Sequence, residues 1–223
     1  MNLRKNAKIA GIAYLFYIAV GVANELLMSR ATRADGTAGT LARVAQHATD
    51  VRLAVLFGIG ESFSALVLAV TMYAITRDVG QELALMALVC RAAEGLINAV
   101  NVPKHMALLW LADATRGPGA LDAGTTNALG TLFLMPGGPV GAVFFAVGST
   151  LFSYLLLRGR MVPVVLAGFG VVSSVLLVIG LPLQLAGFVA GPLMGFLWLP
   201  EFAFAFAIGT WLMVKGVSAP VPR

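Results

Sequence analysis

Residues 83–112 read LALMALVCRAAEGLINAVNVPKHMALLWLA, an apolar stretch long enough to cross a membrane as a single helix. Five polar side chains interrupt it at steps of three or four residues: Arg91, Glu94, Asn98, Asn101 and His105. At about 100° per residue, these steps place all five on one helix face. A charge near the bilayer centre costs on the order of 2.5–3.5 kcal/mol. We therefore expect this polar face to lie against other helices or a wet cavity, away from lipid.

The composition of the whole chain is that of a membrane protein. Of its 223 residues, 59% are hydrophobic and 11% are charged, whereas a soluble domain carries about 25% charged residues. Four long stretches contain no Asp, Glu, Lys or Arg: residues 9–24, 62–76, 123–157 and 161–200. These features exclude an ordinary soluble fold. They predict an all-α polytopic membrane protein whose main partner is the lipid bilayer.

The apolar stretches predict one transmembrane domain over residues 1–223 with six helices. The predicted spans are residues 8–28, 53–76, 83–112, 128–157, 161–181 and 193–214. Pro136, Gly137, Gly138 and Pro139 predict a helix break within the fourth span, because proline lacks a backbone N–H and both residue types disturb helices. Such breaks recur at transporter binding sites, but a simple packing kink accounts for the same residues.

Basic residues predict that both termini are cytoplasmic. With that orientation eight basic residues lie on the cytoplasmic side: Arg4, Lys5, Lys8, Arg77, Arg158, Arg160, Lys215 and Arg223. Five lie on the opposite side: Arg30, Arg33, Arg43, Arg52 and Arg116. The excess follows the positive-inside rule. Since these residues sit at segment ends and no basic run alternates with aromatic residues, the net charge of +5 does not predict nucleic-acid binding.

Three further glutamates, Glu25, Glu61 and Glu201, fall within other predicted spans. Counted along each helix at about 1.5 Å per residue, they lie at middle or outer depth, as Glu94 does. We expect these four glutamates to share one outward-opening polar cluster with the face described above, that is, with Arg91, Asn98, Asn101 and His105. Such a cluster can relay protons, bind a small ligand or ion, or form a hydrogen-bonded tie between helices.

The chain lacks the common catalytic motifs. It contains no H-E-x-x-H pattern, no P-loop and no G-x-S-x-G. The sequence therefore predicts no zinc site of the H-E-x-x-H type and no cofactor. Three functions remain open: a small transporter or proton-coupled protein, an intramembrane metal-assisted enzyme acting on lipid, and a non-catalytic scaffold. Of these, charge at midplane depth favours the first. The sequence specifies no substrate and no oligomeric state.

Four short motifs resemble a known family. Residues 8–15 read KIAGIAYL, residues 90–94 read CRAAE with Asn98 following, residues 159–163 read GRMVP, and Pro200-Glu201 precede WLMVKG at residues 211–216. With these motifs the chain resembles the bacterial membrane proteins called domain of unknown function 4386. The resemblance implies a multi-helix protein of the bacterial cytoplasmic (inner) membrane. It implies no activity, because the family name records none.

Overall fold

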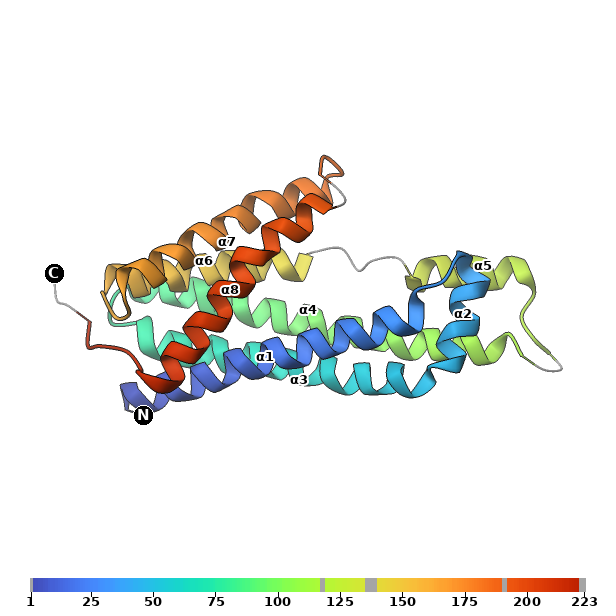
Figure 1. The fold of residues 1–223 in the computed structure, drawn as a ribbon, viewed down its shortest axis with the longest axis horizontal. Helices are drawn as coiled ribbons and strands as arrows, with labels where there is room; N and C mark the ends of the chain where they lie inside the picture. The colour runs from blue at the N-terminus through green and yellow to red at the C-terminus, as the bar shows by residue number, and fades with distance from the viewer. Residues whose placement is uncertain (1, 117–118, 135–139, 190–191, 221–223) are drawn as a thin grey trace. The chain divides into compact units, whose positions relative to one another are not determined.

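The computed structural model describes residues 2–116, 119–134, 140–189 and 192–220, and every regular element in this part of the chain is an α-helix. The helices follow one another without any intervening strand in the described ranges (Figure 1). They are α1 (Leu3–Thr32), α2 (Gly36–Gln46), α3 (Ala48–Thr76), α4 (Gln81–Ala114), α5 (Ala123–Leu134), α6 (Val140–Arg158), α7 (Val164–Leu185) and α8 (Pro192–Val214). The predicted all-α class is therefore confirmed.

Six of the described helices, α1, α3, α4, α6, α7 and α8, are long and apolar enough to cross a membrane. This confirms the number of predicted spans. The fourth prediction, residues 128–157, overlaps both α5 and α6. Its first part belongs to α5, whose 12 residues are too few to cross a bilayer that requires about 20, and α6 is the spanning helix. The predicted break at Pro136, Gly137, Gly138 and Pro139 lies outside the described residues.

The chain forms two compact units, each described here by itself. Unit 1 contains residues 1–18, 62–97 and 138–223, and unit 2 contains residues 19–61 and 98–137. Helices α1, α3 and α4 each contribute residues to both units. The prediction of a single domain over residues 1–223 stays a prediction.

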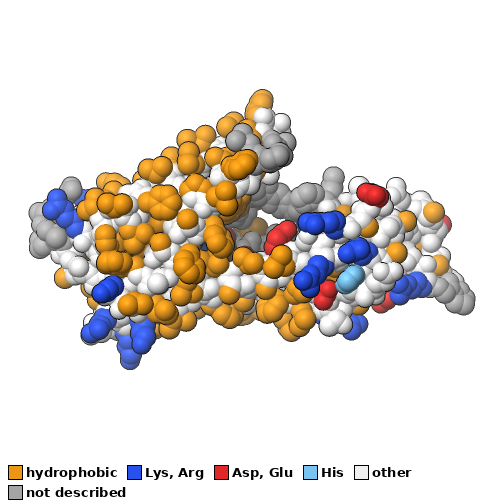
Figure 2. Space-filling model, viewed as in Figure 1, with side chains coloured by type: hydrophobic (Ala, Val, Ile, Leu, Met, Phe, Trp, Pro, Cys, Tyr) orange, Lys and Arg blue, Asp and Glu red, His pale blue; other side chains and the backbone are white. Residues whose placement is uncertain are grey.

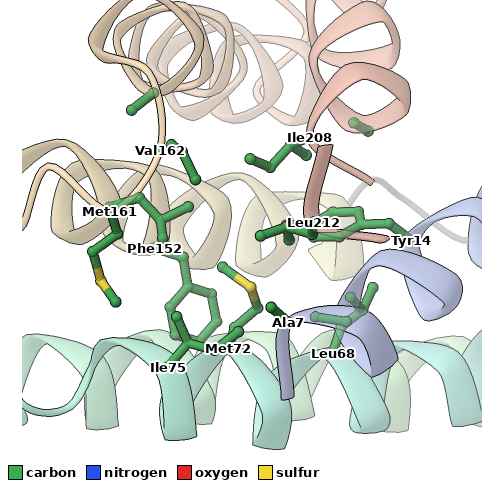
Figure 3. Close-up of a cluster of buried hydrophobic side chains, with 14 of the residues drawn as sticks. Ala7, Tyr14, Leu68, Met72, Ile75, Phe152, Met161, Val162, Ile208 and Leu212 are labelled. Carbon is green, nitrogen blue, oxygen red and sulfur yellow. The ribbon is translucent and has the colours of Figure 1, made fainter. Parts of the chain in front are cut away.

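The core of unit 1 joins its six helices. α7 packs against α6 and α8, and a buried apolar cluster includes Tyr14 of α1, Met72 of α3 and Phe152 of α6. Figure 3 shows the Phe152 ring of α6 beside the α3 side chains Met72 and Ile75. In Figure 2 hydrophobic side chains cover the visible surface of this unit, as expected of helices that face lipid.

The face of α4 that carries Arg91 and Glu94 points into unit 1. Arg91 is 2% exposed and Glu94 is 1% exposed. On the opposite side of the helix, Leu85, Val89 and Leu96 are each at least half exposed. The structure thus confirms that these two charged residues turn away from the surface and that the apolar side of α4 faces outward.

The core of unit 2 is built around α2. Leu41 and Val44 of this helix are buried against Ala31 of α1 and residues of α4 that include Leu111. α2 also packs against α5, which supplies Phe133 to the edge of the same cluster. The short helices α2 and α5 therefore belong to a protein core, although neither is long enough to span a bilayer.

Asp122 begins α5 as an N-cap. Its Oδ2 accepts a hydrogen bond of 2.6 Å from the Thr125 hydroxyl, and its Oδ1 accepts one of 2.9 Å from the Thr125 backbone N–H. The Thr125 hydroxyl first, and then its backbone N–H, lower the pKa of Asp122 because both donate to the charged carboxylate. The cap therefore stabilises α5 above the unfolded pKa of Asp122 and is lost as the pH falls through the lowered folded value.

We predict that Asp122→Ala increases hydrogen exchange of the first-turn amides of α5 at neutral pH. After correction for intrinsic exchange, the difference from wild type should shrink once the pH falls below the folded pKa, where the natural carboxyl is itself protonated. Asp113→Ala, which removes an exposed aspartate of α4, is the matched control and should leave α5 unchanged. Equal protection of α5 in wild type and Asp122→Ala at neutral pH would contradict this assignment.

Candidate functional site

Arg91 and Glu94 form a buried ion pair on α4. They lie three residues apart, a spacing that brings side chains together on one helix face, and Arg91 Nη1 lies 2.5 Å from Glu94 Oε2. The other carboxylate oxygen, Glu94 Oε1, accepts a 2.6 Å hydrogen bond from the Tyr17 hydroxyl of α1. Both oxygens of Glu94 therefore have a partner of complementary charge or polarity.

Aromatic rings surround the guanidinium of Arg91. Its Cζ lies 5.5 Å from the centroid of the Tyr17 ring and 4.6 Å from that of Phe145 on α6. These two rings are parallel, and the Phe145 ring also contacts Trp198 of α8 at a centroid distance of 5.8 Å. Cation–π attraction to these rings partly compensates for the hydration that the guanidinium of Arg91 loses on burial.

Gly148 makes room for the aliphatic part of Arg91. A Cβ at this α6 position would lie 2.8 Å from Arg91 Cγ and 3.0 Å from Arg91 Cδ. Since both are atoms close to the backbone of α4, they could not move aside without displacing the side chain. Gly148 thus lets α6 approach α4 closely, so that the guanidinium lies near the aromatic rings.

Glu201 of α8 is the second buried carboxylate of unit 1, and it is 2% exposed. Its Oε1 accepts a 2.7 Å hydrogen bond from Ser149 of α6, and its Oε2 accepts a 2.6 Å bond from Ser173 of α7. The carboxyl group therefore connects three helices. Pro200 precedes it within α8 and has no backbone N–H to donate, so the helix is locally weakened beside the carboxyl group.

The buried charges do not balance. Among the described residues, the buried charged side chains are Arg91, Glu94 and Glu201, which leaves one carboxylate more than the single guanidinium can neutralise. Glu201 lies near Arg91, because a Cβ at Gly148 of α6 would meet the Arg91 side chain and the next residue, Ser149, donates to Glu201. The ion pair on α4 and the carboxyl group on α8 are thus parts of one electrostatic system, here called the buried charge cluster.

The other sequence-predicted site residues lie in unit 2. Glu25 is exposed, whereas Glu61, Asn98, Asn101 and His105 are partly buried. Within this unit, α1 and α3 pass closely enough that a Cβ at Gly21 would lie 3.4 Å from Glu61 Oε1. The structure therefore brings together Arg91, Glu94 and Glu201, and the sharing of one outward-opening site with the residues of unit 2 stays a prediction.

Sequence reasoning missed the hydrogen-bonding partners of the two carboxylates. Tyr17, Ser149 and Ser173 lie in stretches that contain no charge, and serine in a membrane helix commonly bonds to its own backbone. Ser174, adjacent to Ser173, does so, donating to Gly170 O at 2.6 Å. The signal that separates the two serines is tertiary, because it depends on which helix lies opposite each hydroxyl.

The described residues do not form a metal-binding group of three or more His, Cys, Asp or Glu side chains. The two carboxyl groups of the buried charge cluster have Arg91, Tyr17, Ser149 and Ser173 as partners instead. What this arrangement offers chemically is a site for a proton or a charged group, held by donors that can reorient.

The chain matches the family called domain of unknown function 4386 over residues 9–216, and it belongs to that family. The match includes Arg91, Glu94 and Glu201 and the side chains that contact them. No curated protein and no solved structure shows significant similarity to the chain. The family assignment therefore agrees with a multi-pass membrane protein and adds no activity.

We predict that Glu94→Gln lowers the free energy of unfolding by about 3–5 kcal/mol, because it removes the carboxylate in direct contact with the buried guanidinium, whereas Glu201 is bonded to serines. Glutamine keeps one oxygen that can accept from Tyr17, but its NH2 group then faces the guanidinium, so the variant loses both the charge and the second acceptor. Unfolding by denaturing detergent in mixed micelles measures the effect. The double variant Arg91→Met/Glu94→Met should be more stable than Glu94→Gln. A loss no greater than that of Glu82→Gln, an exposed glutamate of the same helix, would refute this account.

Proposed function

We propose that this member of the domain of unknown function 4386 family is a proton-coupled protein of the bacterial cytoplasmic membrane that itself carries protons across the bilayer. The proton binds to Glu201. The ion pair of Arg91 and Glu94 then responds, because protonation of Glu201 changes its electrostatic attraction for Arg91. The observation that carries the proposal is the unbalanced carboxylate. A buried ion lacking a partner of opposite charge costs several kcal/mol, so binding of one proton removes a large energetic penalty.

The hydrogen bonds of Glu201 suit both protonation states. In the charged state Ser149 and Ser173 donate to its two oxygens. When one carboxylate oxygen takes up a proton, the new O–H can donate to a serine oxygen, since a hydroxyl both donates and accepts. Ser173 then has another acceptor for its own proton, because Gly170 O lies 3.2 Å from its oxygen. After protonation, both the new O–H of Glu201 and the hydroxyl of Ser173 therefore have an acceptor.

Protonation also changes the force between helices. With Glu201 charged, Arg91 of α4 is attracted toward α8 as well as toward Glu94 on its own helix. With Glu201 neutral, the first attraction is lost and the pair with Glu94 alone remains. The proton on α8 therefore alters the packing of that helix against its neighbours. Because the cluster is nearly inaccessible here, release of the proton requires α8 to move, and the missing N–H of Pro200 favours bending at that point.

The proposal includes an orientation. Placing the N- and C-termini in the cytoplasm follows from the excess of basic residues on that side. Counted along their helices, Glu25 and His105 would then lie toward the opposite side of the membrane. No observation on the described residues favours the metal-assisted enzyme. A scaffold, in which the cluster only ties helices together, is the alternative that the experiment distinguishes.

We predict that purified protein reconstituted in liposomes carries protons when a potassium diffusion potential is imposed. A trapped pH-sensitive dye reports the rate. Glu201→Gln should lower this rate to that of protein-free liposomes, because the amide cannot exchange a proton under these conditions. Glu82→Gln, on the exposed first turn of α4, is the matched control and should keep the wild-type rate.

The result that would overturn the proposal is equal proton flux in wild type, Glu201→Gln and empty liposomes, which is the outcome expected of a scaffold. Should Glu201→Gln fail to fold, the paired change Ser149→Ala/Ser173→Ala tests the same site. It removes both donors while retaining the carboxyl group, so it should change the pH at which the flux is half-maximal. An unchanged pH profile in the folded double variant would contradict the role of Glu201.

A further inference from the structure

Unit 1 contains a basic groove where the start of α1 meets the end of α8. The cavity has a volume of about 410 Å³. One wall carries Arg4, Lys5 and Lys8 of α1, and the other consists of the apolar residues 212–214 of α8. Figure 2 shows Lys and Arg side chains gathered at this end of unit 1. We call this cavity the basic groove.

Small residues bring the two helices together below the groove. A Cβ at Gly11 of α1 would lie 2.6 Å from Gly209 O of α8, and one at Gly209 would lie 2.9 Å from Tyr14 Cβ. The backbones of α1 and α8 are therefore in close contact at this level. At the upper end, Gly216 adopts a φ of 75° that ends α8, and its backbone N–H bonds to Trp211 O. The basic groove is thus bounded on one side by the close crossing of α1 and α8 at Gly11 and Gly209, and on the other by the turn at Gly216.

Among the described residues, no acidic side chain lines the basic groove to neutralise its charges. Arg4, Lys5 and Lys8 are exposed, and the residues that line the cavity include no Asp or Glu. Arg4, Lys5 and Lys8 take part in none of the ion pairs found within residues 2–116, 119–134, 140–189 and 192–220, such as those of Arg77 with Asp78 and Arg91 with Glu94. Three positive charges therefore converge on one cavity at the end of two membrane-spanning helices.

We propose that the basic groove binds the headgroup of an anionic phospholipid. The phosphodiester would lie between Arg4, Lys5 and Lys8, and the first part of an acyl chain would lie along the apolar wall of α8, where Val214 is 62% exposed. Basic pockets between transmembrane helices bind such headgroups in this manner. The combination of three cations with an apolar wall distinguishes a lipid from a soluble anion, which would gain nothing from residues 212–214. This site is independent of the proton-coupled function.

The test measures phospholipid binding to purified protein in an uncharged detergent, by native mass spectrometry and by thermal stabilisation. Phosphatidylglycerol, phosphatidylcholine and inorganic phosphate are the three probes. We expect phosphatidylglycerol to bind and stabilise the protein, with a smaller effect at high salt, and the other two to have little effect. Equal effects of phosphatidylglycerol and phosphatidylcholine, or full competition by inorganic phosphate, would overturn the proposal.

Two sets of variants locate the site. Arg4→Gln/Lys5→Gln/Lys8→Gln should weaken phosphatidylglycerol binding on the order of tenfold or more, whereas the charge-preserving Arg4→Lys/Lys5→Arg/Lys8→Arg should retain it. The matched control Arg30→Gln/Arg33→Gln/Arg52→Gln removes three exposed charges from unit 2 and should bind as wild type. Undiminished binding in the first variant, or an equal loss in the control, would show that the groove is not the site. The salt dependence in wild-type protein keeps the proposal testable even if the first variant does not fold.

Discussion

The cost of burying charge in an apolar environment governs the structure of unit 1. Arg91, Glu94 and Glu201 are almost completely removed from solvent, and each ion buried without partners costs several kcal/mol. The chain offsets this cost by placing a compensating group from a different helix at every charged side chain. Tyr17 comes from α1, Phe145 and Ser149 come from α6, and Ser173 comes from α7. Polar contacts therefore specify which helices are neighbours, a task that apolar side chains cannot perform alone inside lipid.

Tight packing and charge compensation depend on each other in this arrangement. Gly148 lets α6 approach the aliphatic stem of Arg91, and the rings of Tyr17 and Phe145 then come within range of its guanidinium. The compensation is nevertheless incomplete, since two carboxyl groups share one guanidinium. A purely structural tie would be expected to balance its charges. The excess carboxyl group, together with hydroxyls able to reverse their roles, supports the proposed proton site over a simple helix tie.

The sequence allowed the spans and the inward face of α4 to be predicted because both follow from periodic apolar patterning. The steps between Arg91 and Glu94 predicted one face, and both residues are buried. α5 was not predicted as a separate helix, because residues 123–157 contain no charge and read as one apolar segment. Ser149 and Ser173 could not be recognised either. A serine opposite a carboxyl group and a serine bonded to its own helix look alike in sequence, and only tertiary packing distinguishes them.

Glu201, which accepts hydrogen bonds from two serine hydroxyls in the buried state, is the residue that we propose to bind and release a proton. Difference infrared spectroscopy of the reconstituted protein, recorded as the pH is changed, measures this directly through the C=O stretch of protonated carboxyl groups. We predict a band that appears as the pH is lowered, has the position of a buried hydrogen-bonded acid, and is absent from Glu201→Gln. A wild-type spectrum with no such band, or one whose band persists unchanged in Glu201→Gln, would contradict the account.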